Sequence, residues 1–224
     1  MSADQVAGIT TGQAGLLTAL QVAGFSATNV TKLTDDAVAA IGTKSIGGLK
    51  TDAIGVLSDS QIGKLSADQI KSITTQQIAG FKAAQLGKFT DDQLGALSAA
   101  QVGALSNDQI AGLSAAQIGK LSDTAITGLK ATQITSMSTA QIEGITLSQT
   151  AKLNAAQIGA MAPEGVAKFS VDEIAAIDVS AIKGLSADDI TALDKDHANA
   201  FTTPQIQAMN DDQLAAVVAA YNAA

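Results

Sequence analysis

The chain has 224 residues, of which 46% are hydrophobic and 15% charged, with a formal charge of −8 and no cysteine. This apolar content is enough for a buried core, which excludes wholesale disorder. The acidic charge and the 3% aromatic content argue against nucleic acid and anionic lipid as partners. Without cysteine, disulfides, thiolate metal sites and cysteine nucleophiles are excluded.

No stretch approaches the ~18 consecutive apolar residues that a membrane-spanning helix needs. Residues Met1–Gly8 lack the basic start and the apolar run of a signal peptide. From the sequence we therefore expect no insertion into a membrane.

An eight-residue repeat, the octad, runs through the whole chain. Glutamine recurs at every eighth position from Gln61 to Gln117, and the same frame extends from Gln5 to Tyr221 without insertion or deletion, giving 28 octads. The consensus is Ser/Thr-x-x-Gln-Ile-x-x-Leu, and its eight positions are numbered here from the Ser/Thr. Position 8 always carries a large apolar residue, position 5 does so with four departures, and positions 6 and 7 are often Gly or Ala.

Three structures compete to explain the octad. In one continuous helix the apolar stripe would drift by ~80° per octad, so no partner helix could follow it. In a parallel β-solenoid the two apolar residues, three positions apart, would point to opposite faces of a strand. One short helix per octad places both residues on the same face. The third interpretation is favoured, although short repeats also occur in β-helices.

Local signals for helix ends agree with one helix per octad. Ser66, Ser98 and Ser114 stand at the expected N-cap, and a glutamine follows each of them three residues later, which is the pattern of a capping box. Aspartate gathers near the helix start and lysine one residue before position 8, as the helix dipole favours. Pro163 and Pro204 fall at the first and second helical positions, where a missing N–H is tolerated.

In chain order, the octads are irregular around 12–17, regular over Ser58–Leu121, and irregular again around 162–169 and 194–201. Such short helices persist only when neighbours pack on them. The sequence therefore predicts an all-α, elongated solenoid that forms a single domain over residues 1–224, with atypical ends at Met1–Leu17 and Val218–Ala224 serving as caps. The number of octads in one turn stays open.

One cluster invites a metal-site interpretation. His197, the only histidine, takes the glutamine position beside Asp194 and Asp196. A metal normally needs more converging ligands, so we interpret His197 as a polar substitution in a degenerate octad.

The remaining candidate sites also have simpler explanations. The Asp35–Asp36, Asp91–Asp92 and Asp211–Asp212 pairs lack a calcium-binding loop and fit the helix dipole. The glycines at Gly42 and Gly47–Gly48 match no phosphate-binding loop and indicate close packing or irregular corners. No G-x-S-x-G motif is present. We therefore expect no catalytic residue, no cofactor and no metal.

The run LSAAQVGALSNDQIAGLSAAQIGKL resembles tandem octapeptide repeats of large bacterial secreted and cell-surface proteins, and the resemblance extends over essentially the full chain. It implies a spacer, stalk or adhesin segment at an extracellular location or on the cell surface. It carries over no catalytic residue.

From this we expect a non-catalytic structural scaffold. The alternative is a binding module that presents an extended surface to a protein or glycan. Exposed positions look interchangeable over Ser58–Leu121, which favours the spacer, whereas the irregular C-terminal third keeps the binding module open. An enzyme is the least favoured class, and the oligomeric state is not indicated.

Overall fold

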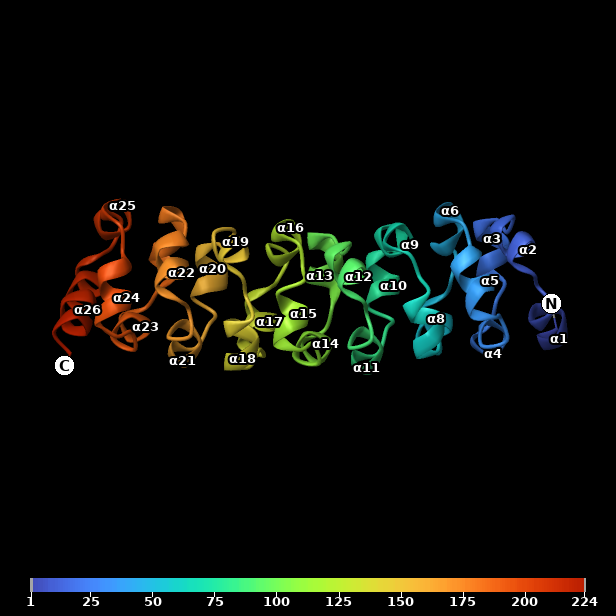
Figure 1. The fold of residues 1–224 in the computed structure, drawn as a ribbon, viewed down its shortest axis with the longest axis horizontal. Coiled ribbons are helices and arrows are strands. Elements are labelled where there is room, and N and C mark those ends of the chain that lie inside the picture. The colour runs from blue at the N-terminus through green and yellow to red at the C-terminus, as the bar shows by residue number, and fades with distance from the viewer. Residues whose placement is uncertain (1, 224) are drawn as a thin grey trace. The chain divides into compact units, whose positions relative to one another are not determined.

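A computed structural model describes residues 2–223 as short helices joined by tight bends (Figure 1). No strand occurs in this range, so the β-solenoid is excluded and the all-α prediction is confirmed. None of the helices described is long and apolar enough to cross a membrane. The chain divides into two units, Met1–Gly112 and Leu113–Ala224, which are described in turn.

Unit 1 consists of helices of four to six residues, one in each octad. They are α1 (Ala3–Ala7), α2 (Thr11–Gly15), α3 (Ala19–Ala23), α4 (Ala27–Val30), α5 (Asp35–Ala40), α6 (Thr43–Ile46), α7 (Thr51–Ile54), α8 (Asp59–Gly63), α9 (Ala67–Ser72), α10 (Thr75–Ile78), α11 (Ala83–Leu86), α12 (Asp91–Gly95), α13 (Ala99–Ala104) and α14 (Asn107–Ala111).

Unit 2 continues the pattern with one 3₁₀ helix, η1, and one long helix at its end. Its elements are α15 (Ala115–Ile118), α16 (Asp123–Ile126), α17 (Ala131–Thr135), α18 (Thr139–Glu143), α19 (Leu147–Thr150), α20 (Ala155–Ile158), α21 (Pro163–Val166), α22 (Val171–Ala176), η1 (Val179–Gly184), α23 (Ala187–Thr191), α24 (Lys195–Ala200), α25 (Thr203–Gln207) and α26 (Asp211–Asn222).

The predicted helix starts are confirmed. Ser66, Ser98 and Ser114 each accept a hydrogen bond from the backbone N–H of the glutamine three residues on, whose side chain accepts from the N–H of the serine in return. Pro163 and Pro204 lie within the first two positions of their helices. Each octad except the last therefore begins its own helix, and up to α26 the backbone bends at the following N-cap.

Within each unit the chain coils so that each helix packs on the helix three octads further along. In unit 1, α2 packs on α5, α5 on α8 and α11 on α14; in unit 2, α15 packs on α18 and α18 on α21. In most octads the side chains at positions 5 and 8, such as Ile110 and Leu113, are almost fully buried. Neighbouring turns thus share one apolar core, and the solenoid of short helices is confirmed.

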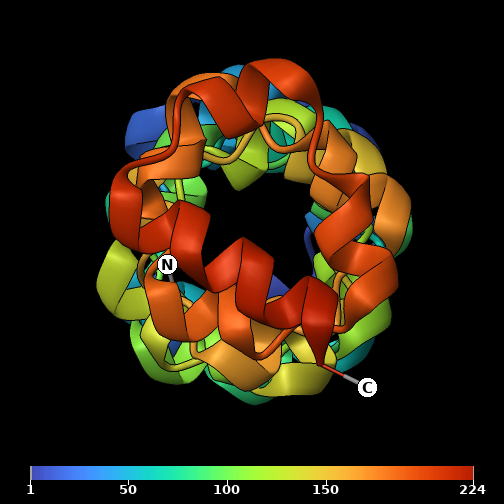
Figure 2. The ribbon, with the colours of Figure 1, turned by 90° about the vertical axis from the view of Figure 1, so that its left-hand side faces the viewer.

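The last two octads depart from one helix per octad, because α26 runs through both of them. Val218, at position 1 of the final octad, offers no side-chain cap, but Gly42, Lys50 and Ala162 offer none either and a new helix begins after each of them. The missing cap alone therefore does not explain the continuous helix. The alanines on either side, at 215, 216, 219 and 220, favour continued helix. In the end-on view, α26 crosses the end of the coil of unit 2 (Figure 2), in contact with α23 and α24.

Small residues at position 7 let successive turns approach closely. A Cβ added to Gly144 would lie 2.3 Å from the carbonyl oxygen of Ala115, and one added to Gly48 would lie 2.1 Å from that of Ala19. Both obstructions are backbone atoms three octads earlier, which no change of rotamer can move aside. Close packing is thus the reason for Gly48, as predicted. A Cβ on Gly42 would meet nothing within 4 Å.

We expect Gly144→Ala to destabilise the protein by about 1–3 kcal/mol, because the methyl group would have to push two turns apart. The matched control is Gly63→Ala in α8, where a Cβ meets nothing within 4 Å. That change should stabilise by about 0.5–1 kcal/mol, because it removes backbone freedom from the unfolded chain. Urea titration of both variants measures the difference, and equal effects would contradict the packing described here.

Candidate functional site

The protein contains a series of buried glutamines at position 4 that form hydrogen bonds between turns, here called the Gln ladder. In each octad of the ladder, the glutamine Nε2 donates to the backbone carbonyl oxygen of the residue 28 positions earlier, at 2.5–2.9 Å. That residue stands at position 8 of the octad four before. The members are Gln61, Gln69, Gln77, Gln85, Gln93, Gln101 and Gln109 in unit 1, and Gln141, Gln149, Gln157, Gln205 and Gln213 in unit 2.

Gln93 shows the geometry of one rung. Its Oε1 accepts from the N–H of Thr90, the N-cap of its own helix, at 2.9 Å. Its Nε2 donates to the carbonyls of Ile62 and Leu65, each at 2.7 Å. One carboxamide therefore satisfies a donor at the start of one helix and acceptors at the end of another. The donor and acceptors lie in adjacent turns of the coil.

The ladder fixes the size of the turn, which the sequence left open. Helices three octads apart pack together, while each glutamine reaches back to the fourth octad. One turn therefore takes between three and four octads, and the 28-residue step of the ladder corresponds to three and a half.

His197 acts as a substitute rung. Its Nδ1 lies 2.7 Å from Oδ1 of Asp194, its own N-cap, and its Nε2 lies 2.7 Å from the carbonyl oxygen of Phe169, 28 residues earlier. Both ring nitrogens thus face protein oxygens, and the imidazole spans the gap that a glutamine bridges elsewhere. Only the protonated imidazole can donate in both contacts.

Asp194, Asp196 and His197 were the candidate metal ligands. Oδ1 of Asp194 accepts from the backbone N–H groups of Asp196 and His197, so it is engaged as a helix cap. Within residues 2–223, no three side chains of His, Asp or Glu are grouped so that they could hold a metal ion. The geometry of this octad is accounted for by the ladder without a metal.

Ser45 is a second substitute, and two acidic replacements, Glu173 and Asp189, keep only part of the rung. The hydroxyl of Ser45 donates to the carbonyl of Leu17, 28 residues earlier, at 2.6 Å. Glu173 and Asp189 retain the contact with their own N-cap, where Ser170 and Ser186 donate to them. A carboxylate has no N–H, so the bond to the neighbouring turn is absent from these two rungs.

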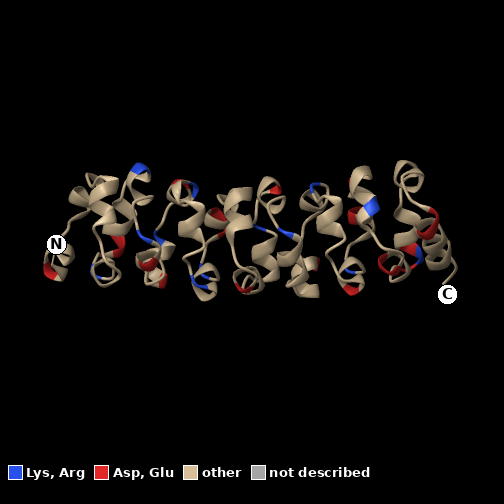
Figure 3. Cartoon of the chain, turned by 180° about the vertical axis from the view of Figure 1, so that it is seen from behind, with Lys and Arg blue, Asp and Glu red and all other residues tan. Residues whose placement is uncertain are grey.

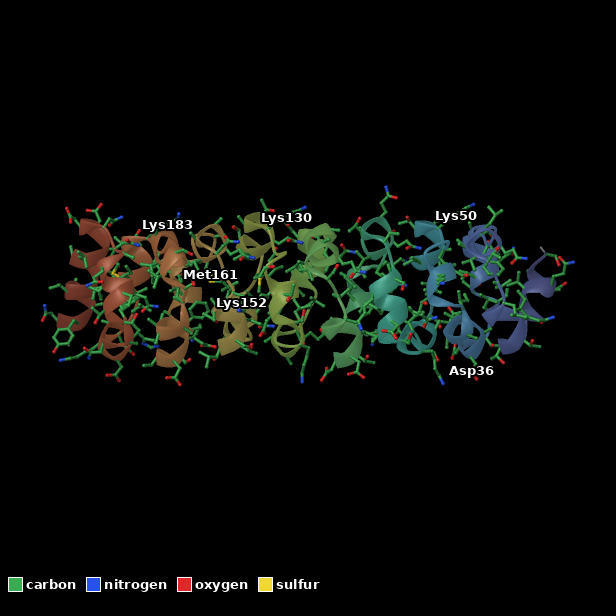
Figure 4. All side chains as sticks on the ribbon, turned by 90° about the horizontal axis from the view of Figure 1, so that it is seen from above. Asp36, Lys50, Lys130, Lys152, Met161 and Lys183 are labelled. Carbon is green, nitrogen blue, oxygen red and sulfur yellow. The ribbon has the colours of Figure 1, made fainter. Side chains whose placement is uncertain are left out.

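The charged positions add contacts between turns that the helix dipole alone does not predict. Asp35–Asp36, Asp91–Asp92 and Asp211–Asp212 lie in first turns of helices, as expected. Lys64 and Lys88 lie at or after the helix end and pair with Asp36 and Asp59 three octads earlier, at 3.3 and 3.6 Å. All four side chains are more than half exposed, so each pair contributes little. Figure 3 shows acidic and basic residues interspersed along the chain in both units, and Figure 4 shows Asp36 at the periphery.

Comparison with known protein families supports a tandem-repeat protein. The chain is similar to the ALTTAQ repeat in three overlapping segments, residues 38–75, 70–107 and 92–123. These segments include the most regular octads of the Gln ladder. A search of curated proteins finds no match.

Hydrogen bonds lower the pKa of two N-cap aspartates, so we expect the stability to depend on pH. Hydrogen bonds from the backbone N–H and the ring of His197 lower the pKa of Asp194 below its ordinary 3.8, and hydrogen bonds from the hydroxyl and N–H of Ser180 lower that of Asp178. A lowered pKa in the folded state means that the cap stabilises above the ordinary pKa and that this contribution is lost as pH falls through the folded value.

We expect Asp194→Asn to reduce the loss of melting temperature between about pH 5 and about pH 2.5, because asparagine caps without titrating. The reciprocal variant is Asn154→Asp in α20, whose side chain already accepts from two backbone N–H groups in the same way. Its melting temperature should therefore fall more between about pH 5 and about pH 2.5 than that of the unchanged protein. Unchanged pH profiles in both variants would show that these caps do not couple titration to folding.

Proposed function

We propose that this chain is a non-catalytic structural scaffold, a spacer or stalk segment of a bacterial surface or secreted protein. The observation that carries the proposal is that the Gln ladder depends only on groups repeated in every regular octad. Because each rung joins a glutamine to a backbone carbonyl, one octad can replace another without loss of the bond. A scaffold of this kind can vary in length while its cross-section stays constant.

The extracellular or cell-surface location is part of this proposal. It is supported by the resemblance of the octads to repeats of bacterial secreted and surface proteins, and it is compatible with the acidic, cysteine-free composition. The similarity to the ALTTAQ repeat supports the repeat character on which the proposal rests.

A specific observation favours a second candidate, a binding module. Three large apolar side chains in unit 2 are exposed at position 2, namely Leu147, Val171 and Val179, at 42–47% of their surface. The helices that begin with Leu147 and Val171 pack on each other. Exposed apolar groups on neighbouring elements are typical of a surface that contacts a partner. This candidate would replace the spacer if changing all three to serine abolished binding to a protein or glycan.

The spacer account is tested by deletions that differ in frame. Removing Ser66–Leu97, four whole octads, brings Gln101 to the place of Gln69, so its amide meets the carbonyl of Ile41. We expect this variant to keep its helical circular dichroism and cooperative unfolding. In small-angle scattering its maximum dimension should fall by about one helix layer, ~8–10 Å.

The control deletion removes Ser66–Gln93, four residues fewer. It places Gln101 opposite a position-4 residue, Ser45, instead of a position-8 carbonyl, and it leaves Leu94 without an N-cap before it. This variant should melt at a clearly lower temperature. Equal tolerance of the two deletions, or an unchanged maximum dimension after the in-frame one, would contradict the spacer.

A further inference from the structure

A cavity of about 250 Å³ opens in unit 2 where the Gln ladder is interrupted. Its walls are mostly apolar and come from four octads, and they consist of Ile134, Thr135, Met137, Thr139, Ile142, Ala160, Met161, Ala162 and Gly165. Met161 is 5% exposed, and its place in unit 2 is marked in Figure 4. A cavity of this volume is large enough for a small aromatic or branched aliphatic molecule.

The cavity is present because glycine replaces glutamine at position 4. Gly165 stands where a ladder side chain would enter, and a Cβ placed there would lie 3.4 Å from Cγ1 of Ile142, an ordinary contact. Ala162 has the extended N-cap backbone of the regular octads, and the helix α21 follows it. Only the carboxamide is missing.

Both residues that would pair with the missing carboxamide, Ala162 and Met137, line the cavity. In a regular octad its oxygen would accept from the N-cap N–H, here that of Ala162, and its nitrogen would donate to the carbonyl 28 residues earlier, here that of Met137. Within residues 2–223, no hydrogen bond is made by the N–H of Ala162 or to the carbonyl of Met137. The slot thus holds an unpaired donor and an unpaired acceptor, at the two chain positions that a ladder carboxamide joins in a regular octad.

We propose that this cavity binds a primary carboxamide that carries a small apolar group. The amide oxygen accepts from the N–H of Ala162, and the NH₂ group donates to the carbonyl of Met137. The apolar group lies against Ile142 and Met161, whose thioether adapts to varied shapes. The ligand is either a free small amide or the side-chain amide of a glutamine or asparagine in a peptide.

The two unpaired groups determine which molecules fit. A carboxylate of the same shape can accept from Ala162 but cannot donate to Met137, and a hydrocarbon satisfies neither group. A tertiary amide also lacks the N–H that Met137 needs. Loss of one or two hydrogen bonds should weaken binding by about tenfold or more.

The test is a titration of the full chain with benzamide, followed by amide NMR shifts and melting temperature. Shift changes should concentrate at residues 137 and 162–166, and the melting temperature should rise. Benzoate, ethylbenzene and N,N-dimethylbenzamide should bind at least about tenfold more weakly. N-acetylglutamine methylamide forms the peptide arm, and the tighter of the two primary amides identifies the source of the ligand.

Two variants at Gly165 test whether the missing carboxamide side chain creates the binding site. Gly165→Gln supplies the carboxamide from the chain itself, so it should raise the melting temperature and abolish benzamide binding. Gly165→Ala adds only a methyl group and should retain binding. The proposal is overturned if ethylbenzene or benzoate binds as tightly as benzamide, or if a folded Gly165→Gln protein still binds it.

Discussion

The carboxamide that joins the start of one helix to the end of another is the interaction on which the rest of the structure depends. A helix of four to six residues leaves almost all of its backbone donors and acceptors without partners inside the helix. Burying such helices would be costly unless every group found another partner. The Oε1 atom of a ladder glutamine supplies one at its own helix start, and the Nε2 atom supplies another at a helix end in the adjacent turn. The apolar residues at positions 5 and 8 can then be buried together.

Two roles in one side chain explain why the octad is so strict. The capping contact fixes the glutamine three residues after the N-cap, and the contact between turns fixes its distance from a position-8 carbonyl at 28 residues. An insertion would change the spacing of every rung that spans it, which are the rungs of the next 28 residues, or about one turn. An insertion between an N-cap and its glutamine would also break the capping box of that octad. Glycine at position 7 adds a third constraint where backbones meet, as at Gly144 and Ala115. The unbroken frame of the sequence is what these coupled contacts require.

Much of the fold could be predicted because its determinants are local. The caps at Ser66 and Ser98, the Pro163 position and the buried pair at positions 5 and 8 all follow from spacing within one octad. The size of the turn could not be predicted, because it depends on contacts between residues 28 apart that no local pattern encodes. The continuous helix α26 could not be predicted from the missing cap at Val218, because Ala162 also lacks a side-chain cap and a new helix begins after it. The helix α26 packs against α23 and α24, which no pattern within one octad encodes.

The candidate site illustrates the same limit. The sequence indicated the capping box but not the bond between turns, although one signal was present. A capping box accepts glutamate as readily as glutamine, yet position 4 carries glutamine in nearly every regular octad. A requirement for an N–H donor explains that preference. His197 looked like a degenerate position and is instead a substitute rung, which could be recognised only once Phe169 was seen opposite its ring.

The central claim is that the amide of a ladder glutamine, beyond its capping role, holds adjacent turns together. The most direct measurement compares Gln93→Glu with Gln21→Glu in urea titrations at neutral pH. Both variants keep the capping box, but Gln93 is 1% exposed and donates to Leu65, whereas Gln21 is exposed and donates to no carbonyl among residues 2–223.

Gln93→Glu should lower the free energy of unfolding by at least about 1–3 kcal/mol, and Gln21→Glu by only a few tenths. Gln93→Met should also destabilise by about 1–3 kcal/mol, which shows that a buried charge is not the sole cause. If Gln93→Glu and Gln21→Glu change the stability equally, the carboxamide does not hold the turns together and the account is wrong.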